Sequence, residues 1–185
     1  RWLAKFAPGQ GELWLRGASD SHIAWSRHWY LAVGKVFARE QLTRKPKGGH
    51  GILLVQIENE YNYHSTPAKA RLLKGLSQAL RESGVEVPLF TCLTNECRAS
   101  RDPELSQVFD GDNYYVGLTE APSCAHRMVS LRQRQPDAPG FVVELQGGWF
   151  STLGGSLSES HYSDARHFNA VLLMSLLGGA TLVNP

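Results

Sequence analysis

The clearest pattern along the chain is a run of apolar residues at helical spacing between residues 67 and 83. The leucines that share one face of this segment are Leu72, Leu73, Leu76 and Leu80. The sequence around them also supplies a start and a stop, because Thr66 suits the N-cap, Pro67 the first helical position and Gly84 the position after the last turn. The pattern therefore predicts a helix over 67–83.

Three further segments have helical periodicity, and we expect helices at about residues 21–42, 123–135 and 158–177. Ser19 or Asp20 is expected to cap the first of them. Trp25 and Trp29 are one helical turn apart in that helix, which predicts that both belong to a core-facing stripe.

Short apolar runs lie between these helices, at residues 52–55, 87–90, 114–116, 141–143 and 181–183. None of them alternates strictly between apolar and polar residues, which is typical of parallel strands that are covered on both faces. Strands that alternate with helices indicate an α/β fold. The glycine pairs at 147–148 and 154–155 lack the G-x-G-x-x-G spacing of a dinucleotide-binding turn, which leaves a (β/α)8 barrel as the other architecture to test.

Composition excludes several classes of protein. The chain has 185 residues, of which 42% are hydrophobic, with 19 Lys and Arg against 17 Asp and Glu. This balance is that of a globular protein and argues against a disordered chain or a strongly basic nucleic-acid-binding protein. The longest nearly apolar stretch, 170–183, is shorter than the roughly 20 residues of a membrane span. The seven His lack metal-binding spacing, so no metal site is predicted, and three Cys leave the redox compartment open.

Polar residues follow the predicted strands directly. The first strand continues into Q-I-E-N-E-Y at 56–61, and the fourth into E-L-Q-G-G-W-F at 144–150. Carboxylates next to apolar strands are costly unless a site uses or pairs them, and barrel enzymes assemble their active sites at the carboxyl ends of strands. Glu60 and Glu144, three strands apart, are thus candidates for a glycosidase pair, in which one carboxyl donates a proton and the other attacks the anomeric carbon. Tyr61 and Trp149 are expected to give sugar rings an apolar face.

These strand ends also resemble the motifs of a known family. Residues 48–61 are similar to the G-G-P-x-x-x-x-Q-x-E-N-E-Y signature of glycoside hydrolase family 35 β-galactosidases, and residues 144–150 to its second motif, E-x-x-x-G-W-[FL]. Residues 16–20, R-G-A-S-D, resemble its L-R-S-x-D. His50 replaces the proline of the signature and Asn62 the glycine that usually follows it, which we expect to affect the accepted sugar or linkage rather than the carboxylates.

The resemblance implies a function and residue roles. It implies a retaining exo-β-galactosidase that acts on terminal non-reducing β-D-galactosyl residues of an oligosaccharide or glycan, without metal or cofactor. Glu60 corresponds to the general acid/base, Glu144 to the nucleophile, and Asn59 to a residue that hydrogen-bonds galactose near its 2-hydroxyl. Glu58 is interpreted as a structural hydrogen-bonding partner.

Three alternatives stay open at this point. The chain could be a non-catalytic carbohydrate-binding barrel, or a related β-glycosidase with another sugar preference, such as an exo-β-glucosaminidase. A barrel acting on phosphorylated metabolites would need a late glycine-rich phosphate loop, and the glycines at 178–179 are better explained as a helix stop.

The resemblance also implies the domain organisation. Residues 1–185 correspond to part of a catalytic (β/α)8 TIM barrel, from about strand 4 to strand 8, truncated at both ends. A complete barrel takes about 250 residues, so we expect this segment alone to be inactive.

Overall fold

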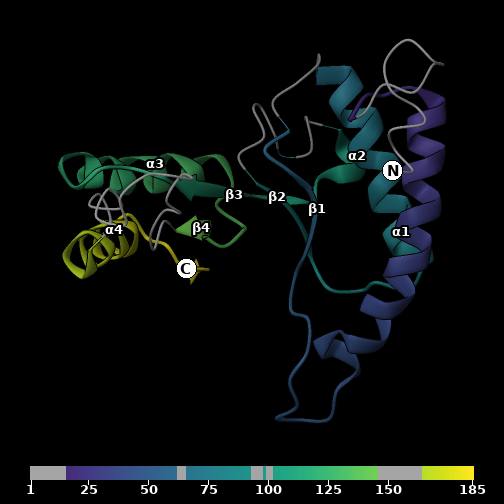
Figure 1. Cartoon of the computed structure of the whole chain (residues 1–185), viewed down its shortest axis with the longest axis horizontal. Coiled ribbons are helices and arrows are strands. Elements are labelled where there is room, and N and C mark those ends of the chain that lie inside the picture. Colours follow the sequence, from purple (N-terminus) through teal and green to yellow (C-terminus); the bar gives the residue numbers. More distant parts are fainter. Residues whose placement is uncertain (1–15, 62–65, 93–97, 99–101, 146–163) are drawn as a thin grey trace, which may run out of the picture. The chain divides into compact units, whose positions relative to one another are not determined.

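The computed structural model describes residues 16–61, 66–92, 98, 102–145 and 164–185. The chain divides into two compact units, Arg1–Phe109 and Asp110–Pro185, which are described in turn. Strands and helices alternate along both (Figure 1), and every strand pairing given below is parallel. The α/β class and the parallel strands predicted from the sequence are therefore confirmed.

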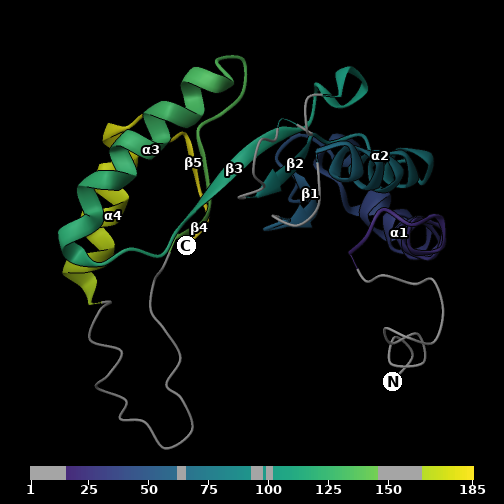
Figure 2. The same ribbon diagram turned by 90° about the horizontal axis from the view of Figure 1, so that it is seen from above.

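The first unit contains two long helices and two strands. Its elements are α1 (Asp20–Glu40), β1 (Val55–Asn59), α2 (Thr66–Glu82) and β2 (Leu89–Cys92), with short 3-10 turns at Leu42–Arg44 and Pro103–Leu105. The two helices lie side by side next to the strands (Figures 1 and 2). β1 pairs with β2 from Val55 opposite Leu89 to Asn59 opposite Cys92. The carboxyl ends of β1 and β2 therefore lie together.

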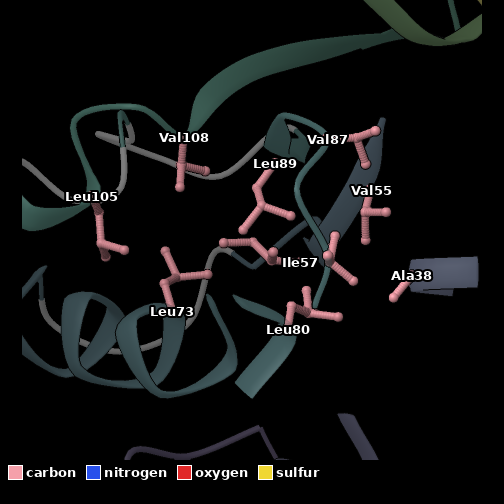
Figure 3. Close-up of a cluster of buried hydrophobic side chains, with 10 residues drawn as sticks. Ala38, Val55, Ile57, Leu73, Leu80, Val87, Leu89, Leu105 and Val108 are labelled. Carbon is pink, nitrogen blue, oxygen red and sulfur yellow. The ribbon is translucent and has the colours of Figure 1, made fainter. Parts of the chain in front are cut away.

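The core of this unit lies between α2 and the strands. Figure 3 shows Leu73 and Leu80 of α2 beside Ile57 of β1, with Leu89 of β2 in the same cluster. Each of these side chains is at most 1% exposed. Burying a side chain of this size stabilises a fold by about 1.5–3 kcal/mol. The leucine face of the predicted helix thus anchors β1, and the helix itself is confirmed within a residue or two at each end.

Helix α1 begins where the sequence predicts but faces differently. The Ser19 side chain accepts a hydrogen bond from the backbone N–H of His22 at 3.3 Å, so Ser19 is the N-cap. Trp25 and Trp29 are 44% and 64% exposed, and the prediction that they belong to the core is wrong for the described residues. The face that packs on α2 instead contains Gly34, against which Ser83 lies so closely that a side chain there would not fit.

The second unit has the same alternation. Its elements are β3 (Phe109–Tyr114, whose first residue belongs to the first unit), α3 (Ala121–Arg134), β4 (Phe141–Leu145), α4 (Ala165–Leu177) and β5 (Leu182–Val183), with a 3-10 turn at Leu118–Glu120. β4 lies between β3 and β5, and α3 and α4 lie side by side (Figure 2). Buried residues from both helices and from β3 and β4 form its core, among them Tyr114, Met128, Val142 and Val171.

Helix α4 begins later than predicted. Asp164 has an extended backbone and its side chain accepts a 2.8 Å hydrogen bond from the backbone N–H of His167, which makes it the N-cap. The predicted start at about 158 falls outside the described residues. None of the helices in the described part of the chain is both long and apolar enough to cross a membrane.

Two strands are placed differently from the apolar runs. β1 covers Val55–Asn59 rather than 52–55, and β3 covers Phe109–Tyr114 rather than 114–116. Both strands contain polar residues, so a prediction based on apolar runs does not detect their full length. In β3 they have partners on α3 and at its end, because Arg127 donates to the Asp112 carboxylate at 2.5 and 3.1 Å, and Gln135 bonds the backbone of Asp110.

Candidate active site

Glu60 lies directly after β1, at the carboxyl end of the strand. Its backbone N–H donates to the carbonyl of Cys92 at 2.9 Å, which continues the pairing of β1 with β2 by one bond. Its φ angle is 48°, in the left-handed region that residues with side chains seldom adopt. The side chain is partly exposed. The chain therefore turns sharply at Glu60 while its amide stays tied to the neighbouring strand.

Glu58 is bonded within the protein. Its Oε1 accepts from Arg16 Nη2 at 2.8 Å and from the backbone N–H of Asn59 at 3.0 Å. Arg16 Nη2 also donates to the carbonyl oxygen of Asn59. With its side chain only 16% exposed, Glu58 has the structural hydrogen-bonding role that the sequence indicated.

Asn59 is the exposed polar residue at this strand end. Its Oδ1 accepts from Gln56 Nε2 at 2.8 Å, and the same nitrogen donates to the carbonyl of Glu58 at 3.0 Å. Gln56 thereby fixes the orientation of the Asn59 amide, a role that the sequence analysis missed. Gln56 lies three residues before Asn59 in the same motif, and this spacing could have indicated its role.

Tyr61 lies in the core of the first unit. Its ring is fully buried and packs with Leu72 and Leu76 of α2. The Arg16 guanidinium carbon lies 5.5 Å from the ring centroid. Burial raises the pKa of the Tyr61 hydroxyl, and the charge of Glu58 adds to this while Arg16 opposes it. A ring with no exposed face cannot stack on a sugar, so in the described structure Tyr61 is a core residue and does not offer the sugar-facing surface that the sequence predicted.

The Glu58 charge also acts on two residues of α1. Tyr30 donates its hydroxyl to the carbonyl of Ile57 at 2.9 Å, and burial, with Glu58 adding to it, raises the pKa of Tyr30 to about 12. Burial lowers the pKa of His22, against the opposing effect of Glu58. α1 therefore supports β1 through the hydroxyl of Tyr30.

Glu144 lies in β4, one residue before its end, opposite Asn113 of β3. Its carboxylate accepts a hydrogen bond from the hydroxyl of Tyr115. Tyr115 is 47% exposed and follows β3 directly. The sequence analysis counted Tyr115 as a strand residue and missed this contact. The pairing of β3 with β4 brings Tyr115 to Glu144. Its position just after a neighbouring parallel strand could have indicated this contact.

The other predicted residues of this unit add little to the site. Trp149 lies outside the described residues. Asn184, after β5, donates its side-chain amide to the carbonyl of Val143 at 2.9 Å and bonds β4 through its backbone as well, so it extends the sheet. Among the described residues, no three His, Cys, Asp or Glu side chains are grouped as they would be to hold a metal ion.

Each unit thus presents one carboxylate at the carboxyl end of a parallel strand. The backbone N–H of Glu60 bonds the neighbouring strand, and the carboxylate of Glu144 bonds a tyrosine hydroxyl. A carboxyl group at such a position can donate or accept a proton, and one oriented by a hydroxyl can attack an electrophilic carbon. These are the two roles that glycoside hydrolysis requires.

Comparison with known proteins agrees with this chemistry. The model of the family described as glycosyl hydrolases family 35 matches residues 2–178. Probable beta-galactosidase C of Aspergillus flavus is 27% identical over 165 residues, which are 80% of this chain and 16% of that protein. Probable beta-galactosidase C of Neosartorya fischeri is 25% identical over 164 residues, 78% of this chain and 16% of that protein.

A second group of relatives gives the same picture. Probable beta-galactosidase B of Pyrenophora tritici-repentis is 26% identical over 175 residues, 77% of this chain and 17% of that protein. The chain therefore spans about a sixth of the length of the curated relatives it matches.

Proposed function

The chain belongs to glycosyl hydrolase family 35, and from this membership we propose that the protein containing it is a retaining exo-β-galactosidase. Its substrate is an oligosaccharide or glycan with a terminal non-reducing β-D-galactosyl residue. The observation that carries the proposal is that Glu60 and Glu144 each lie at the carboxyl end of a parallel strand. The relatives named beta-galactosidase support the choice of sugar.

The proposed reaction has two displacement steps. In the first, the Glu144 carboxylate attacks the anomeric carbon, the glycosidic bond breaks, and Glu60 gives its proton to the leaving oxygen. In the second, Glu60 takes a proton from water, whose oxygen attacks the same carbon and releases Glu144. Asn59 hydrogen-bonds the galactosyl ring. This path requires the two carboxyl groups about 5–5.5 Å apart when the sugar is bound.

The finer architecture belongs to the same proposal. We assign β1 to β5 to about strands 4 to 8 of a (β/α)8 barrel, with residues 1–185 forming part of its catalytic domain. A complete barrel has eight strands and about 250 residues. The segment on its own would then lack part of the pocket and be inactive, so activity is measured in the full-length protein.

Substitution of the two carboxylates in the full-length protein tests the function. Glu144→Gln is expected to lose at least about 10⁴-fold in turnover of an aryl β-galactoside, because no nucleophile is left. Glu60→Gln is expected chiefly to slow the release of poor leaving groups, by about 10²–10⁴-fold. Glu82→Gln, an exposed carboxylate paired with Arg27, is the matched control and should leave turnover unchanged.

Several outcomes would contradict the proposal. Undiminished turnover by the Glu144→Gln variant would refute the nucleophile. An α-configured first product, detected by proton NMR of the released sugar, would refute retention. Galactose binding without turnover would favour a non-catalytic binding protein, and faster turnover of an aryl β-glucosaminide would favour an exo-β-glucosaminidase.

A further inference from the structure

We propose that Arg16 and Glu58 are a positioning pair that sets the backbone conformation of Glu60, and through it the direction of the acid/base side chain. The proposal rests on the proposed function, since it needs Glu60 to act as acid/base. Neither residue is proposed to touch the substrate.

The first argument is the placement of the Arg16 contacts along the chain. Its Nη2 bonds the Glu58 carboxylate at 2.8 Å and the carbonyl of Asn59. Its guanidinium lies 5.5 Å from the centroid of the Tyr61 ring, within the distance of a cation–π interaction. Arg16 thus touches the residues immediately before and after Glu60 and holds the turn from both sides.

The second argument is backbone strain. Arg16 and Glu60, with φ angles of 55° and 48°, are the only residues other than glycine with positive φ in the described part of the chain. A residue with a side chain is strained in this region and persists there only where its surroundings determine the conformation. The side chain of one strained residue bonds the peptide next to the other.

The two peptide groups that lead into Glu60 each have hydrogen bonds that hold them. The N–H of Asn59 donates to Glu58 Oε1 at 3.0 Å and the carbonyl of Asn59 accepts from Arg16. The N–H of Glu60 donates to the carbonyl of Cys92 at 2.9 Å. Loss of Arg16 removes the bond to the Asn59 carbonyl, which belongs to the peptide that defines φ of Glu60.

The third argument is that this pair differs from the surface ion pairs of the same unit. The Glu58 side chain is 16% exposed, whereas the carboxylates paired with Arg27, Arg44 and Arg71 are 48%, 54% and 89% exposed. Exposed ion pairs contribute little to stability, because water and salt screen them. The structure therefore offers a matched control in Arg44, which pairs with Glu86 at 2.7 Å. Glu86 precedes the start of β2, whereas Glu60 follows the carboxyl end of β1.

The test compares Arg16→Met with Arg44→Met in the full-length protein, with folding checked by circular dichroism and thermal unfolding. A misdirected acid should matter most when the leaving group needs a proton. We expect Arg16→Met to lower kcat/KM about 10²-fold for lactose. For a dinitrophenyl β-galactoside, whose leaving group needs no proton, we expect a loss of at most about threefold. Arg44→Met should match the wild type on both substrates.

A double variant separates positioning from general stabilisation. If Arg16 acts through Glu60, then Arg16→Met added to Glu60→Gln should cost no further activity on lactose. Arg16→Lys keeps the charge but lacks the planar fork that reaches both Glu58 and Asn59, so it should show an intermediate loss. If Arg16→Met fails to fold, Arg16→Lys and Glu58→Gln are compared on the same two substrates.

The outcomes are distinguishable. Equal losses on the two substrates, or losses that add to that of Glu60→Gln, would overturn the positioning role while the proposed function stands. An active wild type whose Arg16→Met variant behaves like Arg44→Met would do the same. A full-length wild-type protein with no glycosidase activity would overturn both proposals.

Discussion

The ends of β1 and β4 each carry one of the two candidate carboxylates, yet the protein holds them in different ways. Glu60 follows its strand in a strained left-handed conformation, and hydrogen bonds to the Asn59 carbonyl and from the Glu60 N–H hold the peptide just before it. Glu144 is within its strand, and its carboxylate receives the hydroxyl of Tyr115. The bonds described for Glu60 hold the peptide before it, whereas the bond described for Glu144 reaches its carboxylate.

This difference suits the two proposed roles. A hydrogen bond to the carboxylate of a nucleophile aims its oxygen atoms at the reacting carbon. Bonds to the peptide before an acid/base residue set the direction in which its side chain leaves the backbone. The comparison therefore predicts that the two sites respond differently to substitution.

The largest expected effect is the loss of turnover when a candidate carboxylate is removed, and the configuration of the azide product then distinguishes Glu144 from Glu60. Glu144→Gly should lose at least about 10⁴-fold in turnover, and azide should restore part of it by attacking the face that the carboxylate leaves open, giving an α-galactosyl azide. Glu60→Gly should form the galactosyl-enzyme and then give the β-galactosyl azide, because azide needs no general base. NMR of the azide products is the measurement, and reversed configurations would exchange the two assignments.

A smaller effect is expected when Glu144 loses its hydrogen bond from Tyr115. Tyr115→Phe removes a hydrogen bond to a charged group, which is worth about 1.5–3 kcal/mol, and should lower kcat by roughly 10–100-fold with little change in KM. Tyr114→Phe is the matched control, because its hydroxyl donates at 3.2 Å to the buried carbonyl of Cys124 instead. That variant should lose stability and keep its kcat. Equal kcat losses in the two variants would show that Tyr115 is only structural.

The smallest expected effect is at the support of β1. Tyr30→Phe removes the 2.9 Å bond to the carbonyl of Ile57 and should lower the free energy of unfolding by about 1 kcal/mol. Because the pKa of Tyr30 is raised to about 12 in the folded state, the stability from its neutral hydroxyl is fully present below about pH 10, the pKa of an unfolded tyrosine. It is lost as the pH rises through about 12.

Absorbance at 295 nm measures this titration directly. The difference between wild type and Tyr30→Phe should show one tyrosine that ionises near pH 12. Ionisation near pH 10 would mean that the hydroxyl is not buried against β1.

Local sequence determined the helices and the order of the elements. α2 is specified by its leucine face and by Pro67 and Gly84, whose φ of 95° suits glycine. The cap of α1 at Ser19 is equally local. The motifs indicated Glu60, Glu144 and Asn59 as candidates, because active-site side chains in this kind of fold lie in short stretches of sequence at strand ends.

Tertiary structure decided the strand positions and the side-chain contacts that these local patterns do not indicate. Asp112 sits in β3 because Arg127, 15 residues later, neutralises it, so no apolar pattern could mark that strand. Burial of Tyr61 and exposure of Trp29 depend on which face of α1 meets α2. The Arg16–Glu58 contact joins residues 42 positions apart. Spacing along a chain records local periodicity, whereas partners for polar and aromatic side chains are chosen by packing between distant segments.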